Sequence, residues 1–206
     1  MSAKRVTEID RLCAEISKCT LCKAHLPDDV YPVIRADERA GILIAGQAPG
    51  RVVYETGLPF KDKSGDRLRD WLGVTEQEFY DKSKFAFLPM GLCFPGSLTS
   101  SATGKGKSGD LPPRPECAQT WHQPVLAALP NIKLVITVGQ YAIKYHIGKN
   151  AKKTLTQTVQ SWRDYWPSII PIPHPSPRNN IWLAKNPWFE TDVLPALKQG
   201  VRESFQ

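Results

Sequence analysis

The stretch GILIAGQAPG, residues 41–50, begins as an apolar run and ends in a turn that carries two glycines. Its first six residues have the length and composition of a short buried strand. A helical pattern follows, in which Leu68, Trp71 and Leu72 fall on one face. The stretch therefore predicts a strand, a loop and a helix in succession, which is the repeating unit of an α/β sheet.

Three further apolar runs have the pattern of strands. They cover residues 85–88, which Pro89 ends, residues 133–139 with the sequence KLVITVG, and residues 168–172. Helical patterns separate these runs, and this alternation is typical of a parallel sheet that is covered on both faces. We therefore predict an α/β fold, a three-layer sandwich with a mostly parallel four-stranded sheet and helices on both faces.

Capping signals mark two of the predicted helix starts. Thr7 and Thr75 each precede an acidic residue by three positions, which is the spacing of a capping box. A last helix is expected after Pro187. Residues 94–116 are rich in Gly, Ser, Thr and Pro, so we predict a loop without a core of its own.

Length and composition bound the kind of protein. The chain has 206 residues, 41% of them hydrophobic, which is enough for one buried core, so we expect a single domain over residues 1–206. The net charge of +7 favours a polyanionic partner such as nucleic acid, although a merely basic soluble protein would have the same charge. No apolar stretch approaches the ~20 residues that cross a bilayer, and the start lacks the apolar core of a signal peptide. We expect a cytoplasmic monomer that does not bind membranes.

Three loops at predicted strand ends carry unusual chemistry. They are GQAPG at residues 46–50, TGLPF at residues 56–60 and HPSPRN at residues 174–179. In open parallel sheets, ligands bind beyond the carboxyl ends of the strands. Together these loops supply backbone donors, an aromatic ring, an imidazole and a guanidinium, the groups that would hold a flat base pulled out of a nucleic acid.

These motifs resemble the uracil-DNA glycosylase superfamily. Its Gly-x-x-Pro-Gly turn and following Gly-x-Pro-Phe are matched by residues 46–50 and 57–60, and its His-Pro-Ser-Pro segment by residues 174–177. The longer match HPSPRN is similar to the single-strand-selective monofunctional branch. The resemblance runs from Cys19 to the last helix and implies a monofunctional DNA glycosylase that hydrolyses the N-glycosidic bond of a flipped, deaminated base, with uracil as the first candidate.

The resemblance also implies roles for individual residues. His174 would donate to the departing base, and the N–H groups around Gln47 and Ala48 would hold a base carbonyl. The base would stack on Phe60. The implied base-binding residues are Phe60, Gly46, Pro89 and Met90, and the implied wedge that enters the DNA stack is Pro175, Ser176, Pro177 and Arg178.

The sequence departs from the family pattern at two positions. Ala48 stands where several branches have an Asp or Asn that positions the hydrolytic water, so catalysis must depend on stabilising the leaving base. Pro89 and Met90 stand where an asparagine usually reads the edge of uracil. The alternative is therefore a catalytically weak or silent member that binds single-stranded or damaged DNA. A small-molecule hydrolase or nucleotide-binding α/β protein is a third possibility, distinguished by weak salt dependence.

Four of the five cysteines have metal-ligand spacing. Cys19 and Cys22 form a Cys-x-x-Cys pair, and Cys93 and Cys117 follow at a distance. Zinc is one possible occupant. The order and rough spacing resemble the iron-sulfur ligands of the family-four enzymes, which implies a 4Fe-4S cluster. Cys13 falls on the apolar face of the first helix and is expected to be a small buried hydrophobe.

Overall fold

The protein is described by a computed structural model that covers residues 5–98 and 109–206. Its main sheet contains β1 (Ile42–Ala45), β2 (Phe85–Phe87), β5 (Leu134–Val138) and β6 (Ile169–Ile172). The strand order is β2-β1-β5-β6, and every neighbouring pair is parallel. The prediction of a mostly parallel four-stranded sheet is confirmed.

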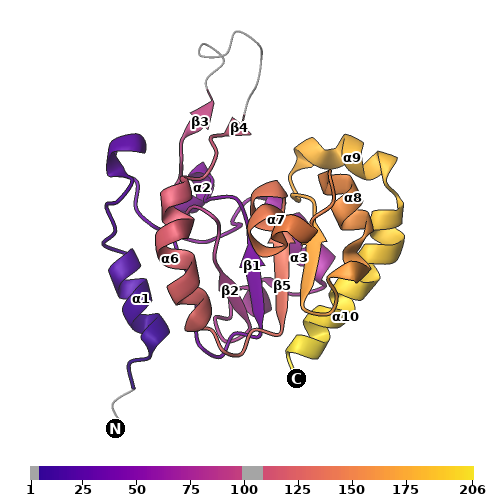
Figure 1. The fold of residues 1–206 in the computed structure, drawn as a ribbon, viewed down its shortest axis with the longest axis horizontal. Helices are drawn as coiled ribbons and strands as arrows, with labels where there is room; N and C mark the ends of the chain where they lie inside the picture. Colours follow the sequence, from indigo (N-terminus) through magenta and orange to yellow (C-terminus); the bar gives the residue numbers. More distant parts are fainter. Residues whose placement is uncertain (1–4, 99–108) are drawn as a thin grey trace.

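Helices surround this sheet (Figure 1). The α-helices are α1 (Glu8–Ile16), α2 (Arg51–Thr56), α3 (Lys63–Leu72), α4 (Glu76–Phe79), α6 (Pro115–Ala127), α7 (Gln140–His146), α8 (Leu155–Gln160), α9 (Asn180–Lys185) and α10 (Leu194–Ser204). Short 3-10 segments are η1 (Lys23–His25), η2 (Gly148–Asn150), η3 (Trp162–Asp164) and η4 (Pro177–Asn179), and η5 (Phe189–Val193) is a π-helical turn before α10. No helix within the described ranges is long and apolar enough to span a bilayer.

The strands bury both of their faces. Along β1, Ile42 and Ile44 join the core cluster that includes residues of α3, α8 and α10, whereas Leu43 joins the cluster of α1 and α6. Alternate side chains of a strand point to opposite faces, so a strand between two helical layers is apolar throughout. Figure 1 shows α1 and α6 on one side of the sheet and α8 and α10 on the other. The three-layer prediction is confirmed.

Both predicted capping boxes are present. The Thr7 hydroxyl accepts the N–H of Asp10 at 3.3 Å and the Asp10 carboxylate accepts the N–H of Thr7 at 3.1 Å. Thr75 forms the same arrangement at the start of α4. Cys13 is half-buried against the α1–α6 cluster, so the expectation of a buried residue holds only in part.

The region predicted as a loop, residues 94–116, needs correction. β3 (Ser97–Leu98) and β4 (Gly109–Asp110) pair antiparallel within it, and α6 already begins at Pro115. Residues 99–108 lie outside the described residues. Two-residue strands contain no periodicity, so the composition of the segment could not show this hairpin. The hairpin stands above the main sheet in Figure 1.

Candidate active site

A cavity of about 110 Å³ opens where β1, β2 and β6 end. Three loops that are far apart in the sequence meet there, because the carboxyl ends of parallel strands share one edge of the sheet. The predicted residues that line the cavity are Gly46, Gln47, Ala48, Phe60, Pro89 and His174. The sequence therefore brings most of its candidate base-binding residues to one place.

Met90 is the exception, and its prediction as a base contact is corrected. Its side chain is only 6% exposed and packs in a core cluster with Ala45, Ala118 and Ala142. A side chain buried on that side of the turn cannot reach a base. Met90 contributes through its backbone instead, since its N–H donates to the carbonyl of Gly46 at 2.9 Å.

The turn after β1 presents backbone donors. The carbonyl of Gln47 accepts the N–H of Gly91 at 2.9 Å, and the Gln47 side-chain amide donates to the carbonyl of Leu111 at 3.0 Å. Within residues 5–98 and 109–206, neither the N–H of Gln47 nor that of Ala48 donates a hydrogen bond. The side chain of Gln47 thus fastens the turn to the segment after β4, and the two N–H groups have no acceptor among the described residues.

Phe60 is held by its backbone. Its φ of +55° is unusual for a residue with a side chain. The Tyr80 hydroxyl donates between the carbonyls of Pro59, at 3.0 Å, and Phe60, at 3.3 Å, and Arg69 donates to the Phe60 carbonyl at 3.5 Å. A Cβ on Gly65 would lie 1.7 Å from that carbonyl oxygen, so only glycine fits there. The clamped ring lies 6.4 Å from the ring of His174, with 35° between the two planes.

His174 has a defined tautomer. Its Nδ1 accepts the backbone N–H of Ser176 at 3.2 Å, so in the neutral ring the proton is on Nε2. The amide of Asn179 donates to the carbonyl of His174 at 2.7 Å and fixes the same loop. His174 therefore offers an Nε2–H donor to the cavity that it lines.

The protonation state agrees with this geometry. Burial lowers the pKa of His174, and the positive charge of Arg178 acts in the same direction. The carboxylates of Asp62 and Asp110 oppose the shift without cancelling it. The imidazole is therefore neutral near pH 7.

The four residues of the predicted wedge differ in exposure: the first is buried, the second is half-buried, and the last two form an exposed tip. Pro175 is buried, so its assignment to the wedge is corrected: a buried ring cannot enter a base stack. Ser176 is half-buried, and its carbonyl accepts a hydrogen bond from the Arg67 guanidinium at 3.3 Å, which holds this part of the loop against α3. Pro177 and Arg178 are exposed at the start of η4.

The hairpin and the first turn of α9 add to the surface at this tip. Arg178 lies against the hairpin, since a Cβ on Gly109 would be 3.4 Å from its Nη1. Ile181, in the first turn of α9, is 71% exposed and adds an apolar side chain near the tip. Ile181 belongs to no sequence motif, so the sequence alone could not identify it as part of this surface.

Pro89 occupies the position where the resemblance implies an asparagine that hydrogen-bonds to the edge of uracil. His122 is fully buried and its Nε2 donates to the carbonyl of Pro89 at 3.1 Å. That carbonyl is therefore already engaged, and the residue presents its ring to the cavity. Nothing at Pro89 can replace the donor and acceptor pair of an amide.

Sequence reasoning missed three polar residues of the cavity wall, Asp62, Ser64 and Asp110. Asp62 caps α3, with its Oδ1 accepting the N–H of Gly65 at 3.1 Å, and Ser64 is buried beside it. An N-cap aspartate before a helical pattern could have been found from the sequence. Asp110 could not, because only the hairpin brings it to the cavity.

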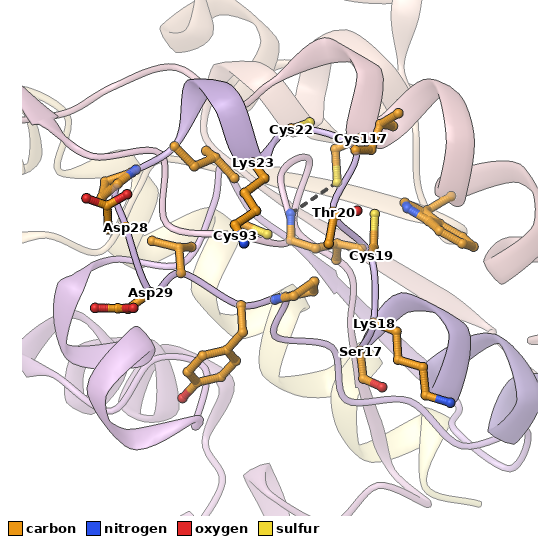
Figure 2. A pocket seen from close by; sticks show the side chains of 18 residues that line it. Ser17, Lys18, Cys19, Thr20, Cys22, Lys23, Asp28, Asp29, Cys93 and Cys117 are labelled. Atoms are coloured by element: carbon orange, nitrogen blue, oxygen red, sulfur yellow. Dashed lines mark hydrogen bonds between the residues drawn. The ribbon is translucent and has the colours of Figure 1, made fainter.

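The four cysteines with metal-ligand spacing all line a second cavity of about 470 Å³ (Figure 2). Burial raises the pKa of the Cys93 thiol to about 12, and the neighbouring Cys117, Cys19 and Cys22 raise it further. The Sγ of Cys117 also accepts the N–H of Leu92 at 3.3 Å. In the part of the chain that the structure describes, no three His, Cys, Asp or Glu side chains are grouped so that they could hold a metal ion.

The fold and the first cavity define a three-layer α/β protein with a cavity at the carboxyl edge of a parallel sheet. The family model of the uracil DNA glycosylase superfamily matches residues 34–198. This chain belongs to that superfamily of DNA glycosylases. It is also similar to the solution NMR structure of a candidate uracil DNA glycosylase from Methanosarcina acetivorans, with 15% identity, a TM-score of 0.44 and coverage of 81% of this chain and 94% of that one.

Proposed function

We propose that this protein hydrolyses the N-glycosidic bond between a deaminated base, uracil first, and a DNA strand. The observation that carries the proposal is the tautomer of His174. A neutral imidazole whose Nδ1 is occupied by the Ser176 N–H offers one donor to the cavity. Such a donor stabilises a departing base on which negative charge develops.

The remaining groups bind the base. Phe60 provides a ring that packs against the rings of Phe79 and Phe87 on a backbone held at its carbonyl, so a flipped base can stack on it. The N–H groups of Gln47 and Ala48 donate no hydrogen bond within the described chain, and in the complex they donate to a carbonyl of the base. Pro177, Arg178 and Ile181 form the exposed surface that fills the vacated place in the DNA stack.

A second candidate function is a binding module without catalysis. The observations that favour it are the methyl group of Ala48 and the engaged carbonyl of Pro89, which leave neither a carboxylate at the first turn nor an amide reader. Such a protein would hold single-stranded or damaged DNA in the same cavity. Excision of a base is the property that separates the two functions.

The test uses single-stranded and duplex oligonucleotides that each carry one uracil, hypoxanthine or xanthine. The proposed function predicts alkali-labile abasic sites with at least one of these bases, together with release of the free base. DNA binding without release on any strand would instead support the binding module. Affinity that does not fall as salt rises would contradict both, since phosphate contacts of a basic protein release counterions.

We also propose that Cys19, Cys22, Cys93 and Cys117 hold a 4Fe-4S cluster. Four thiols around one cavity match the Cys₄ ligand set of such clusters. When bound, the cluster would act structurally, by joining the segment after α1 to the start of α6.

The colour of the purified protein tests this assignment. A cluster predicts a brown protein with broad thiolate-to-iron absorbance in the visible range, and Cys19→Ala should lower the melting temperature before it changes chemistry. The matched control is Cys13→Ala, which should retain the colour. Colourless folded protein with stoichiometric zinc would refute the cluster.

A further inference from the structure

Hydrolysis needs a group near the attacking water as well as a donor to the base. When a base occupies the cavity, its sugar remains at the mouth, and water must reach the C1′ atom there. Ala48 offers only a methyl group. The carboxylates in the cavity wall are those of Asp62 and Asp110, and both residues are exposed, as the mouth of the site requires.

Asp62 is committed to the helix beside it. It is the N-cap of α3, and its Oδ1 accepts the N–H of Gly65 at 3.1 Å. An N-cap carboxylate also interacts favourably with the positive end of the helix. Its geometry is therefore explained by local structure.

Asp110 has a different placement. Its Oδ1 accepts the hydroxyl of Ser97 across the hairpin at 3.1 Å, which orients the carboxylate. Its Oδ2 lies 3.5 Å from where a Cβ on Gly50 would stand, so it faces the turn that carries the predicted backbone donors. The side-chain amide of Gln47 donates to the carbonyl of Leu111, the residue after Asp110, and so fastens the hairpin to the turn after β1.

We propose that Asp110 is the catalytic residue that orients and deprotonates the attacking water, and so replaces the carboxylate that position 48 lacks. This inference rests on the proposed function. It assigns to the hairpin β3–β4 a role in chemistry, because the hairpin carries Asp110 to the rim across from His174.

The reaction balances with these two side chains and water. The water oxygen forms a bond to C1′ as the bond from C1′ to the base nitrogen breaks, and the electron pair of that bond leaves with the base. The Nε2–H of His174 donates a hydrogen bond to the resulting anion. The water proton passes to the carboxylate of Asp110 and then to solvent, and the released base takes up a proton from solvent. No redox step occurs.

The test compares Asp110→Asn with the matched variant Asp70→Asn, which changes an exposed aspartate of α3 that does not line the cavity. General-base catalysis contributes about 10²–10⁴-fold, so Asp110→Asn should slow single-turnover excision by about 10²-fold or more. Its DNA affinity should be unchanged or tighter, since a negative charge near phosphates is removed. Asp70→Asn should keep the wild-type rate.

A second measurement separates chemistry from structure. Sodium formate should partly restore the rate of Asp110→Ala, because it supplies a small carboxylate to the vacated space, and should not accelerate Asp70→Ala. Wild-type excision together with a fully active Asp110→Asn would overturn this inference and leave the proposed function intact. Equal losses for both aspartates, with no rescue by formate, would also overturn it. A wild-type protein that excises no base would overturn both proposals.

Discussion

Gly65→Ala tests how the stacking platform is built. A Cβ at this position would lie 1.7 Å from the carbonyl oxygen of Phe60 and 2.6 Å from its carbonyl carbon. Both are backbone atoms, so no side-chain rotation can relieve the clash. Either the first turn of α3 or the segment that carries Phe60 must move.

The magnitude follows from this overlap. Overpacking of a buried site costs about 1–3 kcal/mol, and occasionally more. At roughly 2–4 °C per kcal/mol for a chain of this size, the melting temperature should fall by about 2–12 °C. Displacing the Phe60 ring by about 1 Å should also slow excision by roughly 10²-fold, because the base would no longer be held in the reactive geometry.

The assay pairs thermal unfolding with single-turnover excision of uracil from single-stranded DNA. Gly148→Ala is the control: unlike Gly65, Gly148 has a positive φ, +58°, and nothing lies within 4 Å of its added Cβ. It should lose stability through backbone strain and retain the excision rate. If Gly65→Ala excises uracil as fast as the wild type, Phe60 is not the clamped platform described above.

Two further predictions concern the exposed tip and the half-buried His146. Arg178→Ala and Ile181→Ala should each impair duplex substrates more than single-stranded ones, where little stacking must be broken; equal losses on both would mark these side chains as plain DNA contacts. Burial lowers the pKa of His146 to about 4, below the 6.5 of an ordinary histidine, so its contribution to stability is complete above pH 6.5 and is lost as the pH falls toward 4. The loss is roughly 3 kcal/mol, and urea unfolding should show a smaller decrease between pH 7 and about pH 4.5 for His146→Gln than for the wild type. An equal decrease in both proteins would refute this assignment.

Local signals predicted much of the fold. The apolar runs at β1, β2, β5 and β6 bury both faces, and a capping box needs only four consecutive residues, so each could be found from sequence alone. Residues 46–50, 57–60 and 174–177 also converge as expected, because parallel strands bring their carboxyl ends to one edge.

The remaining features depend on contacts that are distant in sequence. The orientation of Met90 is set by packing against α6 and α7, and the clamp on Phe60 involves Gly65 and Tyr80. Asp110 reaches the cavity only because β3 and β4, each two residues long, pair although they are ten residues apart in the sequence. None of these contacts has a periodicity or a motif that sequence reasoning could use.

His174→Ala gives the most direct test of the central claim, that this cavity stabilises a departing base through one neutral imidazole. The measurement is the single-turnover rate of uracil excision, from single-stranded and duplex DNA, with the dissociation constant for each strand measured in parallel. We predict a loss of about 10²–10³-fold on both strands, as is typical when one transition-state donor is removed, with nearly unchanged affinity. An active wild type and an equally active His174→Ala variant would contradict the claim.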